Sequence, residues 1–195
     1  MIYPPAEQRP GPAWKVWPDQ NAREGVILHS LEGSGLAGLS QLVGTVQVSW
    51  HFTVLKDGAV WQHYGLDSSC WHAGNRANNA RLIGIEHEGK AGEPLTEAQT
   101  QASVALVRWI AATQGWPLER HTRLLEHNEV YATACPSGRI PWERYVPENE
   151  PNHEDGYDTG LTRLRLEDIL RLIRDEHAHA EGDKQVLHDI IDGTR

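Results

Sequence analysis

Apolar residues alternate with polar ones, or form short continuous runs, through the first half of the chain. The run 26–29, Val-Ile-Leu-His, is rich in β-branched residues and predicts a buried strand whose last residue, His29, lies at the end of a sheet. Residues 46–54 alternate strictly between apolar and polar side chains, which predicts a half-buried strand. In that strand Trp50 and His51 would face opposite ways.

A hairpin and a further strand are predicted next. Residues 56–58, Lys-Asp-Gly, are typical of a tight turn, and residues 59–64 supply the returning strand of the hairpin. Residues 82–88 form another apolar run with the same period. On this strand Glu86 and Glu88 share one face, so both carboxylates would point to the same side of the sheet.

The three- and four-residue period of a helix is clearest after Thr96. Residues 96–99, Thr-Glu-Ala-Gln, match a capping box, in which the Thr side chain accepts from the Gln99 amide and Gln99 reaches back. Gly115 ends the helix, and residues 36–43 predict a shorter one. Strands followed by such helices predict an α/β fold with a mixed central β-sheet flanked by helices.

The two ends of the chain differ from this central part. Residues 1–24 are rich in proline and have no steady period, which predicts an irregular arm over a domain spanning 1–147. Residues 148–195 begin as a polar linker and continue as a helical C-terminal extension with apolar stripes. These apolar stripes could mediate self-association of two chains. We favour the alternative, in which they pack against the chain's own domain.

Composition excludes several classes of function. The chain has 195 residues, enough for one well-cored domain plus an appendage. Its net charge of −9 argues against nucleic-acid binding, which depends on clustered Lys and Arg. No apolar run approaches the roughly 20 residues of a membrane span, and the N-terminus lacks a signal-peptide layout. We therefore expect a protein that is cytoplasmic in the cell that makes it.

Two cysteines occur, and one of them has a suggestive neighbour. Cys135 follows His127 by eight residues, and a thiolate with an imidazole makes two-thirds of a zinc site. His29 is the best candidate for the third ligand, which would leave one position of Zn²⁺ open to water. A disulfide between Cys135 and Cys70 is the competing interpretation, since a bridged sulfur cannot bind a metal as a thiolate.

Several segments of the chain occur in an order known from one protein family. They are Ile27-Leu28-His29-Ser30, Ser49-Trp50-His51-Phe52-Thr53-Val54, Lys56-Asp57-Gly58, Trp71-His72-Ala73-Gly74-Asn75, Ile83-Gly84-Ile85-Glu86 and His127 through Cys135-Pro136. Over roughly residues 20 to 146, the chain resembles the N-acetylmuramoyl-L-alanine amidases of the type-2 amidase and peptidoglycan-recognition-protein superfamily. The resemblance implies that His29, His127 and Cys135 hold a catalytic zinc ion, and that residues 1–147 form a zinc amidase domain.

The same resemblance implies roles for the remaining site residues. Some family members use a Tyr at the position of Trp50, and others use a Glu at the position of Glu86. An indole has no titratable proton near neutral pH, so the resemblance implies that Glu86 transfers the proton. Thr133 lies where relatives place an oxyanion-stabilising Lys or Thr. The residues expected to contact substrate are Trp50, His51, Trp71 and His72.

The implied activity is zinc-dependent hydrolysis of the amide between N-acetylmuramic acid and L-alanine in peptidoglycan. A phage endolysin that acts on the cell wall after release from the host cytoplasm fits the compact chain best. The alternatives are a cytosolic amidase that recycles anhydro-muropeptides and a non-catalytic peptidoglycan-binding module. A Cys at position 135 argues against both alternatives. Binding modules of the family typically lack this Cys, and the recycling enzymes resemble one another in having an Asp at this position.

Overall fold

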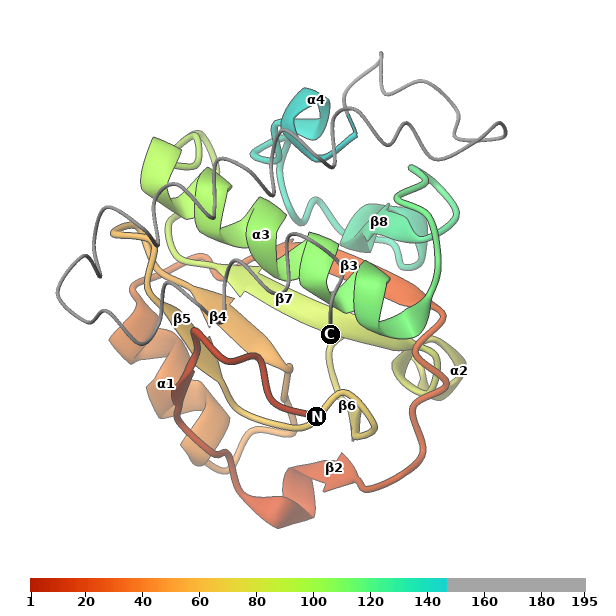
Figure 1. Ribbon diagram of the computed structural model, residues 1–195. Coiled ribbons are helices and arrows are strands. Elements are labelled where there is room, and N and C mark those ends of the chain that lie inside the picture. Colours follow the sequence, from red (N-terminus) through yellow and green to blue (C-terminus); the bar gives the residue numbers. More distant parts are fainter. Residues whose placement is uncertain (147–195) are drawn as a thin grey trace, which may run out of the picture. The chain divides into compact units, whose positions relative to one another are not determined.

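The computed structural model describes residues 1–146, and these form a mixed α/β fold around one six-stranded sheet (Figure 1). The predicted linker and helical extension over 148–195, and any self-association through them, lie outside the described residues. The strands in order across the sheet are β1 (Glu7–Gln8), β5 (Val60–Gln62), β4 (Phe52–Val54), β7 (Leu82–His87), β3 (Gly25–Ser30) and β8 (Leu124–Glu126). The predicted fold class, a mixed sheet flanked by helices, is confirmed.

The centre of the sheet consists of parallel strands. β3 pairs in parallel with both β7 and β8, and β7 pairs in parallel with β4. All six residues of β3 are buried, as its continuous apolar sequence predicts for a strand covered on both faces. The hairpin is also as predicted, because β4 and β5 are antiparallel and Gly58 adopts a φ of +89° in their turn.

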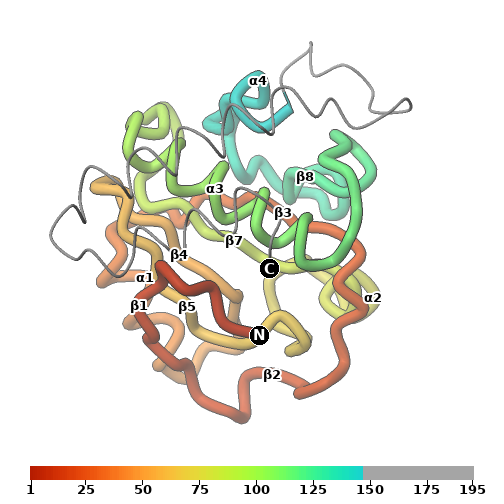
Figure 2. Tube along the Cα trace, viewed as in Figure 1, coloured from red at the N-terminus to blue at the C-terminus, as the bar shows by residue number. Residues whose placement is uncertain are grey.

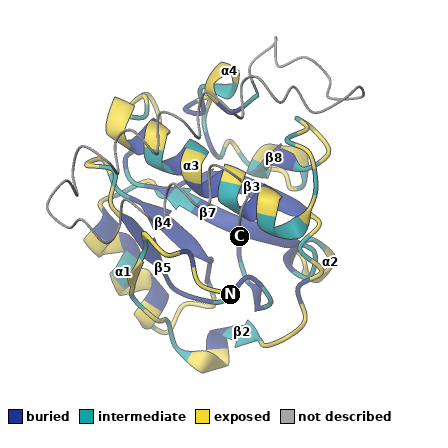
Figure 3. Cartoon of the chain, viewed as in Figure 1, coloured by how far each residue is buried: buried dark blue, intermediate teal, exposed yellow. Residues whose placement is uncertain are grey.

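Helix α3 (Glu97–Gln114) covers one face of the sheet. Its buried residues Leu106 and Ile110 pack in one core cluster with apolar strand residues such as Leu28 and Ile85. Figure 3 shows the resulting division of α3 into a buried side toward the sheet and an exposed side away from it. Figure 1 places α4 (Trp142–Tyr145) beyond this helix, and Tyr145 donates from its hydroxyl to Ser103 of α3 at 2.7 Å.

The ends of α3 follow the predicted signals, with one correction. Thr96 accepts a hydrogen bond from the Gln99 amide at 3.0 Å, and Gly115 ends the helix with a φ of +70°. The Gln99 side chain does not reach back to Thr96, as a capping box requires. It is fully buried and donates instead to the carbonyl oxygens of Val54 and Glu88, at the ends of two neighbouring strands.

Helix α1 (Gly35–Val43) packs toward the other side, near the hairpin. Its Leu42 forms a second cluster with Trp50, Tyr64 and Cys70. Gly35 approaches the hairpin closely, since a Cβ at that position would lie 2.3 Å from Leu55. Because α1 covers the β4–β5 end, the outer face of β3 and β7 is left to loops, to α2 (Arg76–Asn79) and to the candidate site.

The predicted strand over residues 46–54 is shorter than expected. The alternating segment 46–54 is a strand only over Phe52–Val54, and Val46 is 60% exposed. Ser49 explains the difference: it donates from Oγ to the Lys15 carbonyl at 2.7 Å and accepts from the Trp71 amide at 2.8 Å. These bonds attach Ser49 to neighbouring loops, whereas the next bond to the sheet comes from the His51 amide, which donates to the Gly84 carbonyl at 3.0 Å. A local pattern carries no information about such distant partners.

The N-terminal arm is more regular than its prolines suggest. β1 adds a parallel edge strand beside β5, as Figure 2 shows. After the 3-10 helix η1 (Ala13–Lys15), β2 (Val16–Trp17) pairs with β6 (Ser69–Cys70) in a separate two-stranded ribbon. Each paired run is two residues long, which is too short to produce a recognisable period.

Burial keeps His63 of the hairpin region neutral. His63 is 4% exposed, donates from Nδ1 to the Arg9 carbonyl at 2.7 Å, and accepts from the Thr53 hydroxyl at 2.9 Å. Its burial lowers its pKa from 6.5 to about 4, and the charge of Arg9 lowers it further while the carbonyl bond opposes the shift. Between these pH values the unfolded chain binds a proton at His63 that the folded chain does not.

The free energy of unfolding should therefore fall as the pH drops from about 6.5 to 4. The sign follows because protonation favours the state with the higher pKa, here the unfolded one, and a full shift corresponds to roughly 3 kcal/mol for this imidazole. Denaturant unfolding from pH 7 to 4.5 measures the slope. In His63→Leu the free energy of unfolding should depend less steeply on pH, by a slope that corresponds to at most one proton. A slope identical to that of the wild type would contradict the assignment.

Candidate metal centre

The register of the sheet brings the candidate residues into one row. β3 and β7 pair His29 with Glu86, and β7 and β4 pair Glu86 with Thr53. These three side chains share the face opposite α3, because the alternate residues Leu28 and Ile85 point into the core beneath that helix. The row lies at the carboxyl ends of parallel strands, where α/β sheets commonly bind ligands.

β8 extends this row by one residue. It pairs Leu28 with Glu126, so the next residue, His127, lies beside His29 as the chain leaves the sheet. The two imidazole rings are 4.6 Å apart, centre to centre, in an edge-to-face arrangement. His127 opens the short 3-10 helix η2 (His127–Glu129), which turns the chain toward the loop that carries Cys135.

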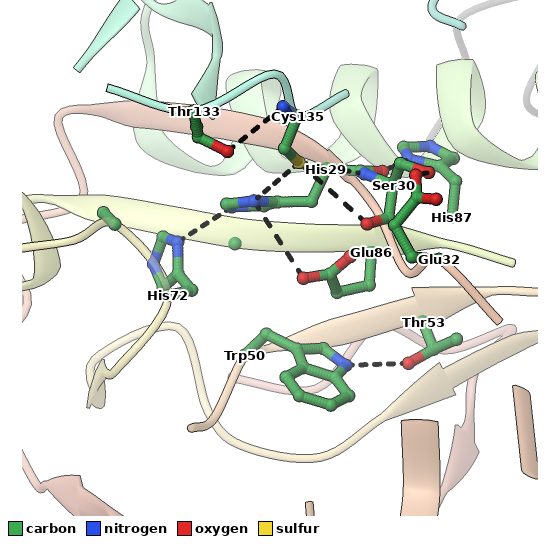
Figure 4. Close-up of polar contacts among 12 residues, drawn as sticks. His29, Ser30, Glu32, Trp50, Thr53, His72, Glu86, His87, Thr133 and Cys135 are labelled. Atoms are coloured by element: carbon green, nitrogen blue, oxygen red, sulfur yellow. Dashed lines mark hydrogen bonds and ion pairs between the residues drawn. The ribbon is translucent and has the colours of Figure 1, made fainter. Parts of the chain in front are cut away.

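The Cys135 loop returns to the end of β3. Cys135 accepts at Sγ from the Ser30 amide at 3.3 Å, and its carbonyl accepts from the Asn128 amide at 3.0 Å. Its Sγ is 3.7 Å from Nδ1 of His29 (Figure 4). Cys70 is also free and lies buried beside His51, so the alternative of a disulfide is not formed.

The three predicted ligands are brought together and suit a zinc ion. One donor atom from each of His29, His127 and Cys135 lies within 4.8 Å of the others. His127 Nε2 is buried, yet it has no hydrogen-bond partner among the residues that the structure describes. Such an orphaned nitrogen is costly unless something else binds it, and two imidazoles with one thiol form a donor set that Zn²⁺ prefers.

Burial sets the resting protonation of the cluster. It lowers the pKa of His29 well below 6.5, and His72 and His127 lower it further, so the imidazole is neutral as a metal ligand must be. Burial, aided by the nearby Glu86 carboxyl, raises the pKa of the Cys135 thiol to about 12. The thiol is therefore protonated without a cation, and metal binding would release that proton.

Glu86 lies beside His29 on the neighbouring strand. Its Oε1 lies 3.9 Å from His29 Nδ1, and its side chain is 13% exposed. Oε2 is buried and makes no hydrogen bond within residues 1–146. Burial raises the pKa of this carboxyl to about 8, with the charge of Glu32 adding to the shift and that of Arg139 opposing it.

Thr133 lies in the loop two residues before Cys135. Its Oγ1 accepts a hydrogen bond from the Cys135 amide at 3.2 Å, so the hydroxyl helps to shape the loop (Figure 4). Its hydrogen remains available to another acceptor, because a hydroxyl accepts and donates at once.

The four predicted substrate contacts differ in accessibility. Trp50 is 3% exposed and donates from its indole to Thr53 at 2.8 Å, and His51 is fully buried with both ring nitrogens bonded. His72 is 8% exposed and lies behind His29. Trp71 packs against Trp17 of the arm with ring centres 4.1 Å apart, and it is partly exposed, so it is the most accessible of the four.

Arg139 supports the site, although nothing in its sequence context suggested a role. It is 4% exposed and donates to the Ser30 hydroxyl and to the carbonyl oxygens of His87, Glu88 and Glu93. These bonds fasten the chain just after the Cys135 loop to the ends of β3 and β7. Arginine is usually exposed, so burial of this kind shows only in the folded chain.

Tyr131 is a second residue that the sequence did not single out. Its ring stacks on His127 with centres 5.8 Å apart, and its side chain is 50% exposed. It also packs against Gly74, where a Cβ would lie 2.1 Å from the ring. Gly74 has a φ of +75°, so both its conformation and this contact require glycine.

The fold and the His29, His127 and Cys135 cluster define an α/β protein with three candidate metal ligands at the carboxyl edge of its sheet. Comparison with known proteins identifies its family. A family model described as N-acetylmuramoyl-L-alanine amidase matches residues 19–138. The chain therefore belongs to this amidase family, and the resemblance found in the sequence is confirmed.

Individual relatives agree with this assignment. Endolysin 2638A of Staphylococcus phage 2638A is 27% identical over 150 residues, covering 70% of this chain and 30% of that protein. The N-acetylmuramoyl-L-alanine amidase CwlH of Bacillus subtilis (strain 168) is 34% identical over 169 residues, covering 75% and 64%. The solved catalytic domain of XlyA matches with a TM-score of 0.55 and 26% identity, covering 66% of this chain and 88% of that one. The chain thus spans less than two-thirds of either curated relative.

Proposed function

We propose that the chain is a zinc-dependent N-acetylmuramoyl-L-alanine amidase that cuts the amide between N-acetylmuramic acid and L-alanine in peptidoglycan. The observation that carries the proposal is the cluster of His29, His127 and Cys135, in which His127 Nε2 has no hydrogen-bond partner among the described residues and Glu86 lies beside His29. An endolysin and an amidase among the relatives support a role as a phage endolysin, released from the host cytoplasm to act on the wall.

The proposed chemistry divides between the ligand cluster and Glu86. A bound zinc ion supplies a Lewis acid for the amide carbonyl and activates water at neutral pH. Glu86 is placed to take a proton from the attacking water and later to give it to the leaving amine. A cation within about 4–6 Å would favour the carboxylate form that the first transfer needs.

Two accessible aromatic rings could contact the sugar or the stem peptide. Tyr131 packs on the candidate ligand His127, and Trp71 precedes His72, which lies behind His29. We assign peptidoglycan as the partner on this basis, together with the family membership. No helix within residues 1–146 is both long and apolar enough to cross a membrane.

Zinc analysis combined with an assay on purified sacculi tests the proposal. We expect one zinc per chain, release of free L-Ala amino groups from intact sacculi, and loss of that activity in a chelator with recovery on adding Zn²⁺. Activity confined to soluble muropeptides would indicate a recycling amidase instead. Tight binding to sacculi without new amino groups would indicate a binding module, and the enzymatic proposal would then be wrong.

Thr133→Val should lower the turnover number modestly, by about 10-fold or less. A hydroxyl is a neutral donor, so its stabilisation of a developing oxyanion is weaker than that of an ammonium group. Thr133→Ser keeps the hydroxyl and is the matched control, with activity close to the wild type. If both variants turn over at the wild-type rate, Thr133 serves only the loop through its bond from the Cys135 amide.

A further inference from the structure

His72 lies directly behind the candidate ligand His29. Its Nδ1 is 3.1 Å from His29 Nε2, and its own Nε2 is 3.1 Å from the Leu82 carbonyl oxygen. We infer that His72 is a positioning residue, which fixes the tautomer of His29 so that Nδ1 faces the metal without a proton. The inference rests on the proposed function, in that a metal is what His29 is prepared to bind.

The tautomers follow from a chain of donors and acceptors. The Leu82 carbonyl can only accept, so His72 must carry its proton on Nε2 and donate it there. A neutral imidazole with Nε2 protonated has a lone pair on Nδ1, which must accept from His29 Nε2. His29 then carries its own proton on Nε2, and its Nδ1 is left with a bare lone pair.

That bare nitrogen is the one that faces the ligand cluster. His29 Nδ1 is 3.7 Å from Cys135 Sγ and 3.9 Å from Glu86 Oε1. Figure 4 shows His72 and Cys135 on opposite sides of the His29 ring, joined to it through different nitrogens. The Leu82 carbonyl therefore determines, through His72, which nitrogen of His29 is free to bind a metal.

The surroundings hold His72 in this orientation. Gly84 of β7 lies against the ring, and a Cβ there would be 2.7 Å from it, so the close packing depends on glycine. Asn79 accepts through Oδ1 from the amides of His72 at 3.1 Å and Ala73 at 2.7 Å, which fixes the backbone beneath the ring. His72 is 8% exposed, so solvent does not offer an alternative set of partners.

The same contacts argue that this histidine serves the ligand and not the substrate directly. Both of its ring nitrogens are bonded within the protein, which leaves neither for a muramyl peptide. Outer partners of metal-binding histidines typically contribute 10–100-fold to metal affinity or activity, because they set tautomer, orientation and basicity. Here the support has two steps, because the Leu82 carbonyl orients His72 and His72 orients His29.

The tautomers can be read in the metal-free protein without any variant. Long-range ¹H–¹⁵N correlation spectra of ¹⁵N-histidine-labelled chain near pH 7.5 should show both His29 and His72 protonated on Nε2. This result does not depend on zinc binding or on amidase activity. A His29 signal of the Nδ1-protonated form would overturn the inference even if the proposed function holds.

Zinc affinity supplies the second test, by competition with a chromophoric chelator. His72→Leu should weaken zinc binding 10–100-fold, while His72→Asn, whose Oδ1 can replace Nδ1 as the acceptor, should recover most of it. His63→Leu is the matched control, because His63 is buried with two protein partners away from the ligands. It should bind zinc as the wild type does.

The outcomes separate the two ideas. If the wild type binds no zinc, the proposed function fails, and the tautomer spectra still decide the arrangement of His29 and His72. If the wild type binds zinc and a folded His72→Leu binds it equally well, the positioning role is wrong. Should His72→Leu not fold, His72→Asn and the wild-type spectra decide the question.

Discussion

Replacing Cys135 with Ser should abolish both tight zinc binding and hydrolysis of peptidoglycan. The Cys135 sulfur lies 3.7 Å from His29 Nδ1 and is one of three donors within 4.8 Å. A serine hydroxyl is a much poorer ligand, because it does not ionise as a thiol does when a metal binds. We expect a loss of at least 100-fold in zinc affinity, and amide hydrolysis reduced to background at zinc concentrations that saturate the wild type.

Zinc analysis after dialysis and release of amino groups from sacculi measure the two effects. Cys70→Ser is the matched control, because Cys70 is a free, fully buried cysteine in a different cluster. It should keep zinc and activity if the protein remains folded, although burial of a hydroxyl will lower its stability. Normal zinc content in Cys135→Ser would contradict the assignment of this sulfur as a ligand.

Glu86→Gln should separate metal binding from catalysis. The amide has nearly the same shape as the carboxyl but cannot take up a proton, so we expect normal zinc content with hydrolysis slowed by 10²–10⁴-fold. Glu86 Oε2 makes no hydrogen bond to any described residue, so the substitution should break no structural contact of that atom. Glu86 Oε1 lies 3.9 Å from His29 Nδ1, so the carboxyl is near the candidate metal site and can transfer protons there without itself being one of the three candidate ligands.

The measurement is the turnover number on sacculi, with zinc content and thermal midpoint recorded on the same samples. Glu88→Gln is the comparison, since Glu88 lies two residues on and accepts from the Gly35 and Lys56 amides outside the ligand cluster. It should retain turnover and lose some stability. Full activity in Glu86→Gln would assign proton transfer to another group.

The sequence could predict the parts of the fold whose signals are local. The strands around His29 and Glu86 and the helix after Thr96 depend on hydrophobic period and capping, and the structure contains them. Residues 46–51 were wrongly predicted to be a strand, because their side chains alternate as in a strand although their backbone does not form a strand ladder. The short strands of the arm were missed because two residues show no period.

The candidate site divides in the same way. Its three candidate ligands could be named from residue type, spacing and family resemblance, and the structure brings these residues together. His72 was expected to contact substrate, because its motif lines the groove in the family, and its two bonded nitrogens became visible only in the structure. Arg139 and Tyr131 depend on tertiary contacts between distant segments, which no local pattern encodes.

The register between β3 and β7 has a consequence for how this protein can change. His29 and Glu86 meet because they are paired on neighbouring parallel strands. Inserting or deleting one residue within Leu82–His87 would turn Glu86 toward α3 and direct its neighbour to the ligands, since strand side chains alternate between faces. Substitutions in β7 act one side chain at a time, whereas a single-residue insertion would exchange the core face and the face of the candidate site together.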